Sequence, residues 1–176
     1  MSLALCLCLV MSYVPLMSLT ALGADVVVYI NENGNSTTYT GAYTEVTSGL
    51  TTWSDGWYVV KGDVTVAERI TVSGTVNLIL ADGAQLTANE GICVNQGNTF
   101  IVYAQSEDKA TMGKLTSTGT DYNAGIGGDE GYDNGTVIIN GGITNGMPVV
   151  FNTCVINTAI TYPSSVTIIL SCSIKS

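Results

Sequence analysis

Between residues 70 and 146, short runs of Val, Ile and Leu return at a nearly constant spacing: Ile70 and Ile92 lie 22 residues apart, and Leu78 and Ile101 lie 23 apart. Gly, Asn, Asp and Ser separate the runs, which is typical of short strands joined by tight turns. The runs align in three columns. The first column holds Ile70–Val72, Ile92–Val94 and Gly125–Gly127, the second holds Asn77–Leu80, Phe100–Tyr103 and Val137–Asn140, and the third holds Gln85–Ala88, Lys114–Ser117 and Gly142–Asn145.

This repeat constrains the fold, because one repeat cannot bury its own apolar side chains. Stacking repeats about 4.8 Å apart closes the backbone hydrogen bonds and builds one continuous core. Alternation along the first run directs Ile70 and Val72 inward and Thr71 outward. The sequence therefore predicts an all-β fold, a short parallel, right-handed β-helix (β-solenoid) of about three to four rungs with an N-terminal β cap.

An antiparallel β-sandwich is the alternative, because its strands have similar lengths. It predicts tight Asn-Gly hairpin turns, and the chain contains Asn33-Gly34, Asn134-Gly135 and Asn145-Gly146. We favour the solenoid because the three columns align.

The chain divides into four segments by composition. We expect a signal peptide over residues 1–23, an N-terminal β cap over 24–54, the β-helix rungs over 55–146, and either a divergent last rung and cap or a truncated tail over 147–176. Within the cap, Val26–Ile30 is predicted as a strand and Thr37–Tyr43 as a second candidate.

The first segment has the pattern of an export signal. Residues 1–22 carry no charge, and small residues follow at Gly23 and Ala24, as signal peptidase requires. The alternative is an uncleaved anchor, since about 20 apolar residues can span a bilayer, but Pro15 and the small residues argue against it. We expect a secreted or cell-surface protein with no membrane contact after the signal is cleaved.

Four stretches resemble the parallel β-helical repeat domains of exported surface proteins of Gram-positive gut bacteria. The stretches are Gly56–Val60, Val76–Gly83, Asn123–Gly128 and Gly135–Gly142. The resemblance covers about half of the chain. It implies a surface role of the kind described as carbohydrate-binding or adhesin-like, and it carries over no catalytic residue.

Charge and composition exclude several classes of function. The net charge is −9, with one arginine, four lysines and no histidine, which argues against a nucleic-acid-binding protein and against every histidine-based catalytic or zinc site. Three cysteines follow the signal segment: Cys93, Cys154 and Cys172. Cys154 and Cys172 could pair in an oxidising compartment, or all three could be small buried apolar side chains.

A glycine-rich acidic loop is the candidate metal site. Asp129, Glu130, Asp133 and Asn134 could supply oxygen ligands to calcium, which prefers six to eight oxygens. Asp121 lies nearby in the sequence. The alternative, which we prefer, is a solvated acidic loop that leaves the stack between the first and second columns. We expect no cofactor other than calcium.

Aromatic residues are the candidate carbohydrate-binding site, because flat rings with a polar edge pack on the apolar faces of sugars. The candidates are Trp53, Trp57, Tyr58, Tyr122 and Tyr132. The alternative for Trp57 and Tyr58 is that they cover the open end of the solenoid. Trp53, which lies among threonines and serine, is the better candidate for an exposed ring.

The carboxylates do not suggest an enzyme. Glu107-Asp108 and Asp129-Glu130 are adjacent pairs, so an extended backbone directs their side chains to opposite faces, whereas glycosidases need two carboxyl groups across one substrate. We expect a non-catalytic carbohydrate-binding or adhesive protein whose partner is a polysaccharide or a host or cell-wall glycan. A structural spacer with no ligand is the alternative, and a polysaccharide-degrading enzyme is the third. We expect no nucleic-acid partner, and the uncapped stack suggests end-to-end self-association.

Overall fold

A computed structural model describes residues 26–120, 123–146 and 154–155. These residues form strands and turns and contain no helix, so the all-β prediction is confirmed for them. The expected signal segment, Tyr122, and residues 147–153 and 156–176 lie outside the described residues.

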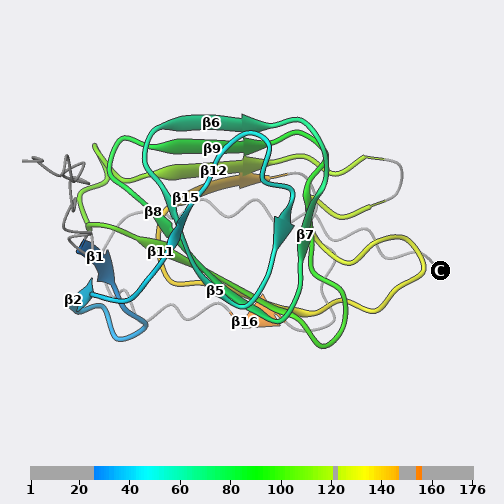
Figure 1. Cartoon of the computed structure of the whole chain (residues 1–176), viewed down its shortest axis with the longest axis horizontal. Helices are drawn as coiled ribbons and strands as arrows, with labels where there is room; N and C mark the ends of the chain where they lie inside the picture. Colours follow the sequence, from blue (N-terminus) through cyan, green and yellow to red (C-terminus); the bar gives the residue numbers. More distant parts are fainter. Residues whose placement is uncertain (1–25, 121–122, 147–153, 156–176) are drawn as a thin grey trace, which may run out of the picture.

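Strands that are far apart in the chain pair in parallel in three sheets (Figure 1). Sheet I contains β4 (Thr52–Trp53), β7 (Ile70–Val72), β10 (Ile92–Cys93) and β13 (Ile126–Gly127); sheet II contains β3 (Thr44–Glu45), β5 (Gly56–Val60), β8 (Thr75–Leu80), β11 (Thr99–Ala104), β14 (Thr136–Ile139) and β16 (Cys154–Val155); sheet III contains β6 (Asp63–Val66), β9 (Gln85–Ala88), β12 (Lys114–Ser117) and β15 (Ile143–Gly146).

From β5 to β15 the chain visits sheets II, III and I in turn and then returns to sheet II. Each new strand pairs in parallel with the strand one repeat earlier, as the three columns predict. This order is compatible with a β-solenoid. The β-sandwich alternative is wrong for the described residues, whose strands pair in parallel except in one hairpin.

The register differs by one residue from our alignment in several places. Ile126, rather than Gly125, pairs with Ile92, and Ile143, rather than Gly142, pairs with Lys114. In the second column, Ile101, rather than Phe100, pairs with Asn77. Ile126 and Phe100 are buried in the core, so burial of the larger apolar side chain sets the register in the first and second columns.

The core lies between the three sheets and consists of inward-facing side chains stacked on one another. In sheet I, Ile70 and Ile92 are fully buried, and Ile126 is almost so. In sheet III, Leu86 lies beside Leu115, and both are fully buried. Thr71 is exposed between two buried residues, which confirms the predicted alternation of the first run.

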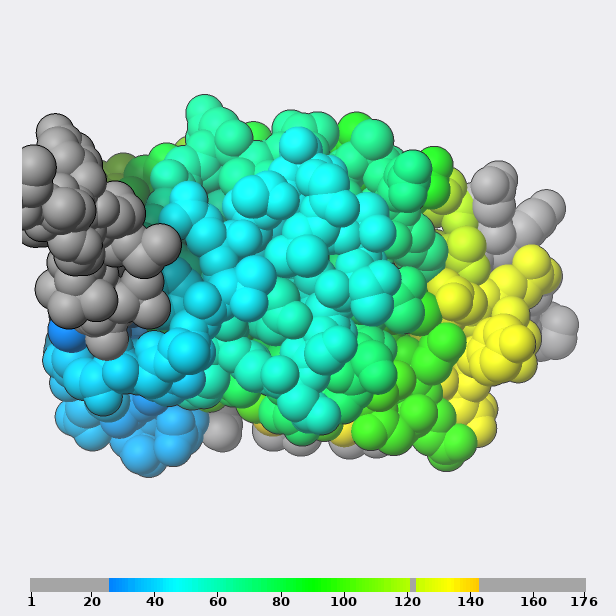
Figure 2. Space-filling model, viewed as in Figure 1, coloured from blue at the N-terminus to red at the C-terminus, as the bar shows by residue number. Residues whose placement is uncertain are grey.

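The expected cap over 24–54 consists of two different structures. Strands β3 and β4 extend sheets II and I by one strand each, and between them Val46 is buried against the core. Figure 2 shows this cyan part of the chain spread over the near face of the molecule. These residues therefore continue the stack, although our alignment left them outside it.

The other structure is an antiparallel hairpin of β1 (Val27–Ile30) and β2 (Ser36–Tyr39), which confirms the Val26–Ile30 prediction. Asn33-Gly34 lies in its turn. Val27 and Tyr29 pack with Val59, Ile79 and Tyr103 of sheet II in a second apolar cluster outside the main core. The hairpin therefore covers the outer face of sheet II.

The sheet III pairs give a direct test of this packing. We expect Leu86→Ala to lower the free energy of unfolding by about 3 kcal/mol, because it leaves a cavity between stacked strands. The exposed neighbour substitution Gln85→Ala should change it by less than about 0.5 kcal/mol. Chemical denaturation of both variants measures the difference, and a Leu86→Ala effect no larger than that of the control contradicts the stacked core.

Candidate functional site

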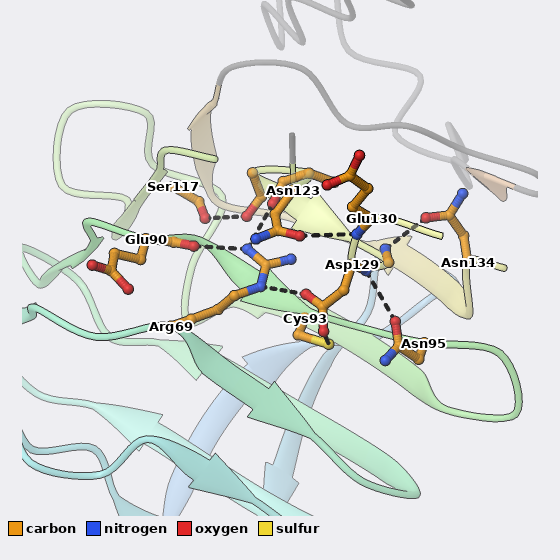
Figure 3. A network of polar contacts seen from close by, with 12 residues as sticks. Arg69, Glu90, Cys93, Asn95, Ser117, Asn123, Asp129, Glu130 and Asn134 are labelled. Atoms are coloured by element: carbon orange, nitrogen blue, oxygen red, sulfur yellow. Dashed lines mark hydrogen bonds and ion pairs between the residues drawn. The ribbon is translucent and has the colours of Figure 1, made fainter. Parts of the chain in front are cut away.

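A cluster of polar side chains connects three neighbouring strands of sheet I (Figure 3). Arg69 immediately precedes β7, Cys93 lies in β10, and Asp129 follows β13. Arg69 Nε lies 2.6 Å from Asp129 Oδ1, and Cys93 Sγ donates to Asp129 Oδ2 at 3.1 Å. Both carboxylate oxygens of Asp129 therefore have a partner from an earlier turn of the chain.

Arg69 also donates hydrogen bonds to two backbone carbonyl groups of later turns. Its Nη1 donates to Glu90 O at 2.7 Å and to Ala124 O at 2.9 Å. Gly91 has φ +85°, and a Cβ there would lie 2.6 Å from Arg69 Nη1. A glycine is therefore needed where the guanidinium crosses the turn before β10. The remaining nitrogen, Nη2, is buried and has no hydrogen-bond partner among the described residues.

Asparagine side chains hold the loop that carries Asp129. Asn95 Oδ1 accepts from Asp129 N at 3.0 Å, Asn123 Oδ1 accepts from Glu130 N at 2.9 Å, and Asn134 Oδ1 accepts from Gly128 N at 2.6 Å. Backbone N–H groups that leave a sheet need acceptors, and these amides supply them. The loop is thus fixed by short polar side chains.

The environment shifts the pKa of the two acidic groups in opposite directions. Burial, followed by the hydrogen bond to Asp129, raises the pKa of the Cys93 thiol to about 11. Burial alone would raise the pKa of Asp129, but hydrogen bonds from Cys93 and Arg69, with the charge of Arg69, hold that pKa below its ordinary value. At neutral pH the cluster therefore contains a protonated thiol and an ionised carboxylate.

This arrangement suits a structural clamp better than a catalytic centre. A thiol that stays protonated at neutral pH is a poor nucleophile, and a carboxylate whose pKa is lowered is a poor general base. We conclude that Arg69, Cys93 and Asp129 tie β7, β10 and β13 together.

The four expected calcium ligands have different surroundings. Asp129 binds Arg69 and Cys93, Asn134 Oδ1 accepts from the backbone, and Glu130 and Asp133 are exposed. Within 26–120, 123–146 and 154–155, no three carboxylate, thiol or imidazole side chains lie close enough together to hold a metal ion. In this arrangement Asp129 is therefore bound by Arg69 and Cys93, and the loop leaves the stack between β13 and β14. Calcium binding by these four residues stays a prediction.

Two of the expected carbohydrate-binding rings are inside the protein. Trp53 is fully buried, and Tyr58 is 7% exposed. The two rings stack with centroids 5.2 Å apart, and Trp53 Nε1 donates to Leu50 O at 3.0 Å. The prediction that Trp53 presents an exposed ring is wrong, because alternation in β4 turns Trp53 inward and Thr52 outward.

Trp57 lies on the outer face of sheet II in a group of rings that sequence reasoning missed. Its ring stacks on Tyr39 at a centroid distance of 4.4 Å and on Tyr103 at 5.5 Å, and Tyr29 lies at 5.1 Å. We call Tyr29, Tyr39, Trp57 and Tyr103 the outer aromatic cluster. Trp57 therefore does not cover the open end of the stack but docks the β1–β2 hairpin. The alternation of side chains along Gly56–Val60 was enough to predict that Trp57 and Tyr58 lie on opposite faces of the sheet. The contact between Trp57 and Tyr39 could not be predicted, because it joins segments that are not adjacent in the sequence.

Tyr132 is the expected binding residue that stays accessible, with 69% of its surface exposed. It lies in the acidic loop between Gly131 and Asp133, which are also exposed. Tyr122 lies outside the described residues.

Comparisons with protein-family models, with curated proteins and with solved structures find no match to this chain. In the part of the chain that the structure describes, no helix is long and apolar enough to cross a bilayer.

The clamp predicts a specific loss of stability. We expect Arg69→Met to lower the free energy of unfolding by about 2 kcal/mol, because it removes several charge-assisted hydrogen bonds that are partly buried. Lys114→Met, which removes the same charge from an exposed position, should cost less than about 0.5 kcal/mol. Equal effects of the two substitutions in urea unfolding would contradict the clamp.

The pKa shift of Asp129 predicts an acid-sensitive contribution to stability. Since the pKa of Asp129 is lower in the folded protein than its ordinary value of 3.8, its ionised form stabilises the fold above about pH 4. That contribution is lost as the pH falls through the folded pKa. We expect Asp129→Asn to flatten the decline of the melting temperature below about pH 4. A decline as steep as that of the unmodified chain would show that Asp129 is not responsible.

Proposed function

We propose that this chain is a non-catalytic, structural β-solenoid of an exported surface protein. Its side chains stabilise the stack of turns, and the stack spaces or presents neighbouring parts of that protein. The proposed fold is a right-handed parallel β-helix of about three to four rungs, since parallel strands joined by crossovers are almost always right-handed. Export is supported by the uncharged leader of residues 1–22 followed by Gly23 and Ala24.

One observation supports the structural assignment: aromatic and charged side chains that could bind a ligand contact each other instead. The Trp53 and Tyr58 rings fill the core, Trp57 stacks on two tyrosines, and Asp129 binds Arg69 and Cys93. A ring stacked on protein has no apolar face left for a sugar. These groups therefore support stability rather than recognition.

Glycan binding is the second candidate function, and the exposure of Tyr132 favours it. The ring is 69% exposed in a loop where Glu130 and Asp133 are also exposed. Aromatic rings beside carboxylates can contact the apolar face and the hydroxyl groups of one sugar. This candidate would make the acidic loop an adhesive site.

Retention on insoluble glycans separates the two candidates. We expect the full chain to pass through plant, mucin and bacterial cell-wall polysaccharides like serum albumin, with calcium or with a chelator. Val26→Ala, which changes another exposed residue, is the control. If the chain is retained on one glycan, and Tyr132→Ala abolishes this retention while Val26→Ala preserves it, glycan binding replaces the structural proposal. Retention that Tyr132→Ala leaves intact would contradict the structural proposal and would show that the glycan binds away from Tyr132.

A further inference from the structure

The structure describes two Asn-Gly pairs in full, Asn33-Gly34 and Asn134-Gly135. An Asn-Gly pair can modify itself without an enzyme. The glycine N–H loses its proton, its nitrogen bonds to the side-chain amide carbon of the asparagine, and the side-chain nitrogen leaves as ammonia. Water then opens the resulting succinimide ring at either carbonyl carbon, which gives aspartate or isoaspartate. Glycine favours ring closure because no Cβ hinders the approach of its nitrogen.

Asn33 lies at the tip of the β1–β2 hairpin. Asn31 N donates to Asn35 O, and Gly34 N donates to Asn31 O, both at 2.9 Å. The residues between Asn31 and Asn35 therefore form a tight turn, in which Gly34 has φ +77°. Asn31 Oδ1 stabilises this turn by accepting from the backbone N–H groups of Asn33 and Asn35, both at 3.0 Å. Asn33 itself is exposed, and its side-chain amide makes no hydrogen bond with a described residue.

Asn134 is followed by the same residue type, but both reacting groups are held. Asn134 Oδ1 accepts from Gly128 N at 2.6 Å (Figure 3), and Gly135 N donates to Val94 O at 2.7 Å. Gly135 is also buried. Ring closure at Asn134 has to break both hydrogen bonds, so it requires a local opening of the corner between β13 and β14.

The space around the two attacking nitrogens also differs. A Cβ built on Gly135 would overlap the backbone carbonyl oxygens of Asn95 and Asn98, whereas a Cβ on Gly34 would meet nothing within 4 Å. Ring closure rotates the peptide group before the glycine, and this rotation needs room. At the hairpin tip only the Gly34 N–H bond to Asn31 O has to break, and exposed loop tips open at a lower free energy than paired strands.

We propose that Asn33 is a site of spontaneous deamidation and that the fold protects Asn134 from the same reaction. Both products replace a neutral amide by a carboxylate next to Glu32, which is also exposed. Isoaspartate, in addition, carries the backbone through the former side chain and lengthens the turn by one carbon atom.

The longer turn affects how the hairpin docks. The length of a hairpin loop fixes the register of the strands that it joins. Strands β1 and β2 place Tyr29 and Tyr39 against the ring of Trp57, at centroid distances of 5.1 and 4.4 Å. Isoaspartate at position 33 therefore loosens the hairpin and its contact with the outer aromatic cluster.

Ageing of the full chain at mildly alkaline pH tests the assignment, with peptide mass spectrometry that distinguishes aspartate from isoaspartate at each position. We expect both products at Asn33 and a reaction at Asn134 that is slower by about 10-fold or more, because the latter requires a local opening. In concentrated urea the two asparagines should react at similar rates, which would show that the fold causes the difference.

Asn33→Gln is the matched control, because its side chain is one carbon atom longer and closes the ring far more slowly. Hydrogen exchange of the Asn31 amide, which donates across the turn to Asn35 O, reports on the hairpin. In the aged chain this amide should exchange faster in the fraction that contains isoaspartate. In aged Asn33→Gln its exchange should remain as slow as in the fresh variant.

Three outcomes would overturn the proposal. Asn33 could stay unmodified in the folded chain while it reacts in urea, or Asn134 could react as fast as Asn33 in the folded chain. Exchange of the Asn31 amide that is equally slow with and without isoaspartate would contradict the loosened hairpin. Each outcome can be read independently of the glycan measurement, since none requires a ligand.

Discussion

Parallel, in-register pairing between successive turns of the chain is the constraint on which the rest of the structure depends. Each strand lies between the strands of the previous and the next turn, so an inward position in one turn lies on an inward position in the next. Ile70, Ile92 and Ile126 form one such row. Burial of these rows excludes polar side chains from most inward positions. Polar and charged side chains therefore lie at the corners and on the outer faces.

The corners explain why the chain contains so many short polar side chains. A strand that leaves its sheet presents N–H groups that neither neighbour pairs. Side chains of an adjacent turn accept them: Asn98 Oδ1 accepts from Gly74 N, and Gln105 Oε1 accepts from Asp82 N, both at 2.8 Å. The Arg69–Asp129 ion pair likewise connects side chains from different turns of the chain. An acidic loop can therefore be required for stability without binding a metal ion.

The repeat predicted much of the fold because it follows from local alternation. The columns, the inward Ile70 and the outward Thr71 could all be derived from the sequence. The functions of the aromatic residues could not, because they depend on contacts between distant segments. Trp53 becomes buried only because β4 extends sheet I, and Trp57 is covered only because the hairpin folds back onto sheet II. The partners of Asp129 lie 60 and 36 residues away, and no spacing rule connects them.

The most direct test of this account is the set of backbone proton contacts between β9 and β12, measured by nuclear Overhauser effects on the full chain. Parallel pairing in the described register predicts contacts that advance in the same direction along both strands, from Gln85 beside Lys114 to Ala88 beside Ser117. Contacts that run in opposite directions along the two strands, or none between them, would contradict the stacked architecture and the structural function proposed from it.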